Sequence, residues 1–221
     1  WDDDNLGIIG EGKFTWPGAI LVDEDEKLYV TDEAKHTVTV LTRDGEVLST
    51  WGEHGAEPGQ LDRPASMAFD ADGHIVISDT MNHRVQTFTR DGEHLGGFGE
   101  QGDGDGQLNM PWGITIDEEG NVFVADWRND RVQKFSCDGE VLLTLGQSGS
   151  GKGEFDRPSA VAVDAHGDIY VCDWGNDRVQ LFSPQGRYVE EFVGNANMSR
   201  SGREYILANQ RVLRLREMAD L

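Results

Sequence analysis

The sequence predicts an all-β protein, a β-propeller built from four-stranded antiparallel blades. The first observation is a period of 47 residues that runs four times without slipping, and repeats of this length are typical of propellers and related arrays. The second is that each repeat contains short runs rich in β-forming residues, separated by Gly, Asp, Asn or Pro. The period is marked by Pro17, Pro64, Pro111 and Pro158, and again by Asp32, Asp79, Asp126 and Asp173.

The last complete repeat, residues 149–194, shows the expected elements in order. A glycine-rich loop ends at Pro158 and leads into a short apolar run. Four strands in about 45 residues is the size of one propeller blade. The four expected strands are 161–164, 168–173, 178–182 and 188–193. We expect blades at about 10–52, 53–99, 100–146 and 147–194, with residues 1–9 as the outer strand of a preceding blade.

The repeated motif resembles the NHL repeat. It consists of a proline, an apolar strand ending in Asp, a strand of the type Val122–Asp126, and then Asn-x-Arg-Val-Gln-x-Phe; Asn82-His83-Arg84-Val85 is close to its centre. The resemblance covers residues 10–194. It implies a β-propeller, most often six-bladed, so a six-bladed ring is expected for the complete protein. A WD-type propeller is less consistent, because the Gly-His and Trp-Asp markers do not recur.

The two ends of the chain depart from the repeat. Six blades would need roughly 280 residues at this period, whereas the chain has 221 and begins with Trp1, so we expect a fragment or a trimmed product. Residues 195–221 lack the proline loop, and 204–219 are rich in good helix formers without Pro or Gly, which predicts a C-terminal helix. The alternative is a degenerate blade with strands at 204–207 and 211–215.

The net charge of −22 bears on possible partners. Nucleic-acid affinity depends on Lys and Arg neutralising phosphates, so we expect no nucleic-acid partner and no anionic membrane partner. Acidic turns are instead expected to keep the protein soluble. No run of 18 apolar residues and no signal peptide is visible, and Cys137 and Cys172 occupy non-equivalent repeat positions, so the compartment stays unknown.

The recurring charged residues predict structure and not chemistry. An Asp ends the second strand of each later repeat and an Arg begins the third, as at Asp126 and Arg131. A catalytic site is a single constellation of distinct roles, whereas one Asp and one Arg per blade form a lattice. Arg can bind several carbonyls and a carboxylate at once, which suits crowded turns between blades.

The residues that vary between repeats gather on one predicted face. In a propeller, the loop before the first strand and the loop between the second and third strands lie at the same end, around the central channel. Aromatic and arginine side chains clustered on a shared surface are typical of binding sites. The predicted ligand-binding residues are Trp16, Arg63, Trp112, Trp127, Arg157 and Trp174. Packing of these tryptophans against the neighbouring blade is the alternative.

These patterns predict a non-enzymatic NHL-type module that binds or scaffolds a protein segment or small ligand without a cofactor. The alternative is a divalent-metal-dependent lyase or hydrolase using Ca or Zn, because some propellers related to NHL proteins are metal enzymes. Only His36 and His83 map to the channel face, and such a site needs several converging ligands. Open blade edges also allow a homo-oligomer, since an unpaired strand edge favours pairing with another chain.

Overall fold

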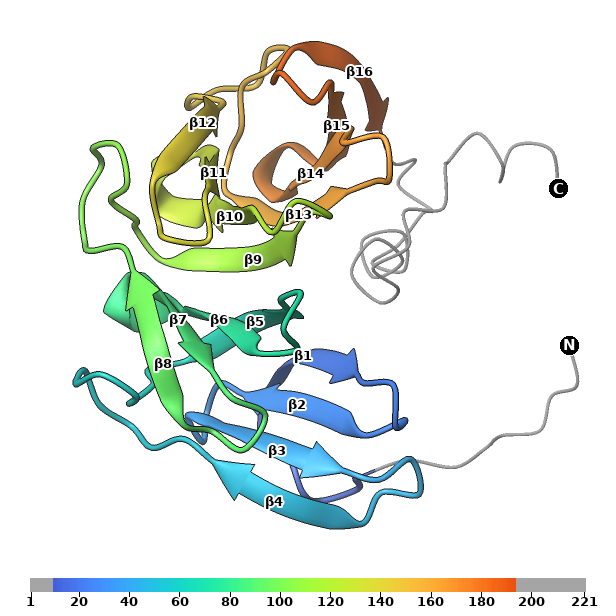
Figure 1. Cartoon of the computed structure of the whole chain (residues 1–221). Coiled ribbons are helices and arrows are strands. Elements are labelled where there is room, and N and C mark those ends of the chain that lie inside the picture. The colour runs from blue at the N-terminus through green and yellow to red at the C-terminus, as the bar shows by residue number, and fades with distance from the viewer. Residues whose placement is uncertain (1–9, 194–221) are drawn as a thin grey trace, which may run out of the picture.

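The computed structural model describes residues 10–193, which form four antiparallel sheets of four strands each (Figure 1). The first blade contains β1 (Pro17–Val22), β2 (Leu28–Asp32), β3 (Thr37–Leu41) and β4 (Val47–Trp51). The second contains β5 (Pro64–Phe69), β6 (Ile75–Asp79), β7 (Arg84–Phe88) and β8 (His94–Phe98). The third contains β9 (Pro111–Ile116), β10 (Val122–Asp126), β11 (Arg131–Phe135) and β12 (Val141–Leu145). The fourth contains β13 (Pro158–Val163), β14 (Ile169–Asp173), β15 (Arg178–Phe182) and β16 (Tyr188–Val193).

The predicted blade architecture is therefore confirmed. Strands follow one another in chain order within every sheet, which is a meander. Short 3-10 turns, η1 (Thr80–Asn82), η2 (Trp127–Asn129) and η3 (Trp174–Asn176), join the second and third strands of the last three blades. The helix expected in 195–221 and the outer strand expected in 1–9 lie outside the described residues, and a six-bladed complete ring stays a prediction.

The first strands of the blades lie side by side, and the fourth strands lie at the periphery (Figure 1). β5 contacts both β1 and β9, and β9 contacts β13. The start of each first strand pairs with the end of the second, as Pro64 does with Asp79. A bulge between Pro64 and Ser66 interrupts this register, and equivalent irregularities occur in the other three blades.

The hydrophobic core lies between the blades. One cluster joins Tyr29 and Val38 of the first blade to Ile77 and Phe88 of the second. Two further clusters join the second blade to the third and the third to the fourth. Alternate residues of each strand point to opposite sides of the sheet, so a strand buried on both sides must be apolar at nearly every position. This explains continuous runs such as Val122–Asp126, which is buried throughout.

The first strand of the first blade is more exposed than its equivalents. Ile20 in β1 is 51% exposed, whereas its equivalents Met67, Ile114 and Val161 are almost fully buried. Val22, in the same strand, is 57% exposed. No blade precedes β1 among residues 10–193, so within this range the side of the first sheet that carries Ile20 has no equivalent of the packing between later sheets.

Polar side chains attach each of the last three blades to the loop that precedes it. We call these loops, residues 52–63, 99–110 and 146–157, the junction loops. In the third blade, Arg131 donates to Oδ2 of Asp126 at 2.7 Å and to the carbonyls of Asp103, Gly104 and Gln107, each at 2.8 Å. Asn129 donates to Asp126 and to the Gly102 carbonyl. The structural role predicted for the charged lattice is confirmed by these hydrogen bonds.

The first blade lacks this lattice. Lys35, Thr37 and Thr39 occupy the positions of Asn82, Arg84 and Gln86. Asp32 instead accepts backbone N–H groups, including those of Thr15 at 2.7 Å and Trp16 at 3.1 Å. Burial alone would raise the pKa of Asp32, but these hydrogen bonds outweigh it and hold the pKa below its ordinary value.

Candidate binding site at the channel face

The junction loops and the loops between second and third strands share one end of the blades, which we call the channel face. Backbone hydrogen bonds tie the two kinds of loop together within each blade. Met81 donates to the Asp62 carbonyl at 3.0 Å, Arg128 to Asn109 at 3.0 Å and Gly175 to Asp156 at 2.7 Å. Side chains from both kinds of loop are therefore presented on the same face.

The first aromatic and cationic group on this face crosses a blade boundary. The guanidinium carbon of Arg63 lies 5.8 Å from the ring centroid of Trp16. Trp16 precedes β1 and is 54% exposed, and Arg63 precedes β5 and is also exposed. This distance is typical of a cation–π contact. Both side chains therefore offer surface to a ligand.

The second group belongs to the third blade. Trp112 at the start of β9 meets Trp127 of η2 edge to face, with ring centroids 5.5 Å apart. The Arg128 guanidinium lies 5.1 Å from the Trp127 centroid. Both tryptophans are half-buried, so they pack on each other as well as presenting surface.

The third group belongs to the fourth blade. The Arg157 guanidinium carbon lies 4.8 Å from the centroid of Trp174, which is 43% exposed. Asp156 accepts from Arg157 Nε at 2.8 Å. This ion pair raises the pKa of Arg157 and lowers that of Asp156. The pair holds the guanidinium over the indole ring.

The six predicted binding residues thus fall into three contacting groups, and the sequence did not predict these pairings. Sequence reasoning also missed Glu33. It occupies the position of Thr80, Trp127 and Trp174, directly after the aspartate of the second strand. A comparison of the four residues at this repeat position would have identified Glu33, because it is the one acidic residue among them.

Glu33 is a buried carboxylate at the channel face. Its exposed fraction is 9%, and its Oε1 lies 3.2 Å from the place a Cβ on Gly18 would take, beside the start of β1. Burial raises the pKa of Glu33; the nearby Arg63 opposes this rise and Asp32 adds to it. Glu33 is therefore a candidate functional residue, and the structural Asp126 beside Arg131 also has a raised pKa.

His36 and His83 serve as acceptors between blades. Nδ1 of His36 accepts the backbone N–H of Arg63 at 3.1 Å, and Nδ1 of His83 accepts that of Met110 at 3.1 Å. Burial lowers the pKa of both imidazoles. His36 has two further metal-binding side chains close to it, whereas His83 belongs to no such group of three among the described residues.

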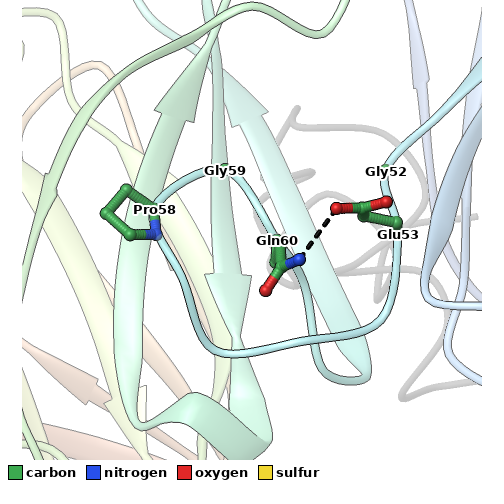
Figure 2. Close-up of a pocket in the computed structure, with 5 residues that line it drawn as sticks. All are labelled: Gly52, Glu53, Pro58, Gly59 and Gln60. Atoms are coloured by element: carbon green, nitrogen blue, oxygen red, sulfur yellow. Dashed lines mark hydrogen bonds between the residues drawn. The ribbon is translucent and has the colours of Figure 1, made fainter.

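The hollow formed by one junction loop is part of the repeated scaffold. Its volume is about 370 Å³, and Figure 2 shows Glu53 and Gln60 pointing toward one another across it. Gln60 Nε2 donates to Glu53 at 2.8 Å. Gln107 donates to Glu100 in the next loop, and in the third the pair is reversed, with Gln147 donating to Glu154. Because all three junction loops contain this Gln–Glu pair, the hollow is not evidence for a ligand site in the first loop.

A second hollow, of about 400 Å³, lies at the opposite end of the first two blades. It is lined by the β1–β2 and β5–β6 turns and by Arg90, which bridges them by binding Glu24 at 2.9 Å. Asp70, Asp72 and His74 lie together there. Asp70 accepts the backbone N–H groups of both other residues, as Asp117 does in the next blade, so this cluster is a recurrent turn.

Two family models match the chain. The SMP-30/gluconolactonase/LRE-like region matches residues 58–148, and the NHL repeat matches residues 155–182. The chain therefore carries repeats of the SGL and NHL types within these residues. No curated protein matches it in sequence.

Solved structures show the same fold. Virginiamycin B lyase from Staphylococcus aureus aligns with a TM-score of 0.64 at 14% identity, over 86% of this chain and 59% of the other. A streptogramin B lyase aligns with a TM-score of 0.64 at 17% identity, over 87% and 58%. A protein of unknown function from Bacteroides caccae aligns with a TM-score of 0.61 at 17% identity, over 82% and 61%. The chain spans about three fifths of the length of these structures.

Within residues 10–193 there is no helix long and apolar enough to cross a membrane.

Proposed function

We propose that this chain is a non-enzymatic propeller module that binds a protein segment or a small ligand on its channel face. The observation that carries the proposal is the set of three contacting groups: Trp16 with Arg63, Trp112 with Trp127, and Trp174 with Arg157. The residue type at these six positions varies from one repeat to the next, whereas the lattice residues of the later blades recur. Exposed aromatic and guanidinium surfaces supply much of the binding energy at protein interfaces.

The pairing of indole and guanidinium groups favours a ligand with both a flat or apolar part and an acceptor for the arginine. The indole rings offer area at low cost in side-chain entropy. The net charge of −22 argues against nucleic acid as that ligand, because phosphates would be repelled. A scaffold role for a protein segment fits the same surface.

The test is a panel of short peptides and small aromatic acids, screened by quenching of intrinsic tryptophan fluorescence. For a ligand found in this way, Trp174→Ala should weaken binding by at least tenfold while leaving Tm nearly unchanged, because Trp174 is half exposed. Leu142→Ala is the control, since Leu142 is similarly exposed on the outer strand β12. Equal affinity in wild type and Trp174→Ala would contradict a site at this face.

Trp112→Ala is the less discriminating variant. Trp112 is half-buried against Trp127, so its removal should lower Tm as well as affinity. A loss of stability without a loss of affinity would identify Trp112 as a packing residue.

A divalent-metal lyase or hydrolase is the second candidate. Its support is the match to the gluconolactonase-like family model and the buried Glu33 carboxylate beside Arg63. A carboxylate with a raised pKa suits general acid or base chemistry near neutral pH. If the chain is such an enzyme, Glu33→Gln should abolish turnover of a cyclic ester or lactone substrate in the presence of Mg²⁺, Ca²⁺ or Zn²⁺. Absence of turnover by wild type with all three metals would contradict this candidate.

A further inference from the structure

Two histidines and an aspartate converge where the first blade meets the first junction loop. His36 follows β2, whereas His54 and Asp62 lie on the loop that leads to β5. Nδ1 of His36 lies 3.3 Å from Oδ1 of Asp62, and Nε2 of His54 lies 3.6 Å from Oδ2 of the same carboxylate. One ligand atom from each side chain lies within 4.8 Å of the other two.

The donor set suits a borderline divalent metal ion. Imidazole nitrogens with a carboxylate oxygen are the ligands that Zn²⁺, Ni²⁺, Co²⁺ and Cu²⁺ share. The two imidazole rings lie next to one another, with centroids 4.3 Å apart. His36 and Asp62 are mostly covered, at 20% and 28% exposure, whereas His54 is 64% exposed. Water can therefore complete the coordination from the open side.

The chemistry of the three side chains also fits a metal ion. One ion can satisfy all three groups at once, because it binds neutral imidazole and ionised carboxylate.

The cluster is absent from the other two described junctions, although their backbones are the same. A bridge joins His54 to Leu61, and equivalent bridges join Gln101 to Leu108 and Ser148 to Phe155. The residues at the three positions are His83, Gln101 and Asn109 at the second junction, and Asp130, Ser148 and Asp156 at the third. The fold therefore does not require His54 and Asp62.

We propose that His36, His54 and Asp62 form a binding site for a divalent transition metal such as Zn²⁺. The metal would fasten the first junction loop to the β2–β3 loop of the first blade. Nδ1 of His36, the ring nitrogen beside Asp62, would bind the metal in exchange for the hydrogen bond that it accepts from the Arg63 N–H.

The experiment measures Zn²⁺ stoichiometry by isothermal titration calorimetry and native mass spectrometry at pH 7.5. It uses a Cys137→Ser background, because Cys137 is an exposed thiol. One bound Zn²⁺ per chain is expected, with Tm rising as free Zn²⁺ increases. At pH 5.5 the affinity should fall at least tenfold, because protons compete for the imidazoles.

The double variant His54→Gln, Asp62→Asn removes two of the three proposed ligands. It installs the residues of the second junction in the first, so folding should be retained without metal. Loss of the bound Zn²⁺ is expected. An unchanged stoichiometry of one would place the metal elsewhere and overturn the proposal, as would a wild type that binds no Zn²⁺ at micromolar concentration.

The reciprocal double variant Gln101→His, Asn109→Asp introduces the same two ligands at the second junction. With His83 already present, it recreates all three side chains at the second junction on an equivalent backbone. Two Zn²⁺ per chain are expected. A stoichiometry that stays at one would contradict the claim that these three positions suffice to build the site.

Discussion

The backbone N–H of Met110 donates to Nδ1 of His83 at 3.1 Å, across the boundary between the second and third blades. Both residues have left-handed backbone conformations, with φ of 55° and 57°. Arg63 bonds to His36 at the preceding boundary, and Arg157 bonds to Oδ1 of Asp130 at the next, at 2.7 Å. At all three described boundaries a backbone N–H therefore donates to a side chain of the preceding blade, which is a histidine at two boundaries and an aspartate at the third.

Removing this acceptor should destabilise the protein. His83→Ala leaves the Met110 N–H without its partner, and we expect the free energy of unfolding to fall by about 1–2 kcal/mol. His83→Asp should retain most of the stability, because Asp130 already performs this role on the same backbone. Urea unfolding of the two variants checks this; equal losses would show that the acceptor atom is unimportant.

The same hydrogen bond predicts a dependence on pH. Burial lowers the pKa of His83 in the folded protein below its ordinary value of 6.5, although Asp126 and Asp79 oppose the shift. The unfolded chain therefore takes up the proton first as pH falls. The stabilisation is complete above about pH 6.5 and is lost as pH falls through the folded pKa. Unfolding free energies measured between pH 7.5 and 5 should fall more steeply for wild type than for His83→Asp.

Arg131→Ala should be among the most damaging single changes. It removes four hydrogen bonds and leaves the buried Asp126 without its cation. We expect a loss of about 3–5 kcal/mol, the cost of leaving one buried charge unpaired. Arg43→Ala is the comparison: Arg43 binds Glu26 at 2.7 Å, but both side chains are exposed, so a change of about 0–1 kcal/mol is expected. Similar losses in both variants would contradict the role of burial.

Thr37→Val should stabilise the protein. Thr37 stands where later blades carry arginine, and its Oγ1 is buried without a hydrogen-bond partner among the described residues. Valine has nearly the same shape and needs no partner, so a gain of about 1 kcal/mol is expected. Differential scanning calorimetry measures it as a higher Tm. A lower Tm would indicate that the hydroxyl does have a partner in solution.

Gly113→Ala should disturb the inner strands. A Cβ at this position would lie 2.6 Å from Cα of Ala160 and 2.7 Å from the Ser159 carbonyl oxygen, both in β13. Because backbone must move to admit the methyl group, we expect a loss of about 1–3 kcal/mol. Gly104→Ala is the control, since a Cβ there meets only the flexible end of Gln107. Chemical denaturation of both variants decides whether the close approach of β9 and β13 is rigid.

Repetition made the blades predictable, because Pro158 and Asp173 recur with their strands at a constant step. It also separated the lattice residue Arg131 from the variable Trp174. The contacts across blade boundaries could not be predicted in the same way. Trp16 and Arg63 belong to different repeats. Which side chains meet depends on how closely the loops of neighbouring blades approach one another.

The convergence of His54 with His36 could not be seen from the sequence either. Their positions within the repeat differ, so no periodic pattern joins them. The N–H donors at the boundaries do leave a trace, since His36 precedes Arg63 by the same interval as His83 precedes Met110. That interval becomes meaningful only once the blades are known to pack side by side.

The attachment of Asn129 and Arg131 to the loop before their own blade has a mechanical consequence. If the chain is pulled from its two ends, each junction loop lies in the path of the tension between one sheet and the next. Side-chain bonds to that loop would then bear the load, and the chain would yield one repeat at a time. Each rupture would release about 160 Å of chain, for 47 residues at roughly 3.4 Å each. The first blade, which has Thr37 in place of the arginine, should yield at the lowest force.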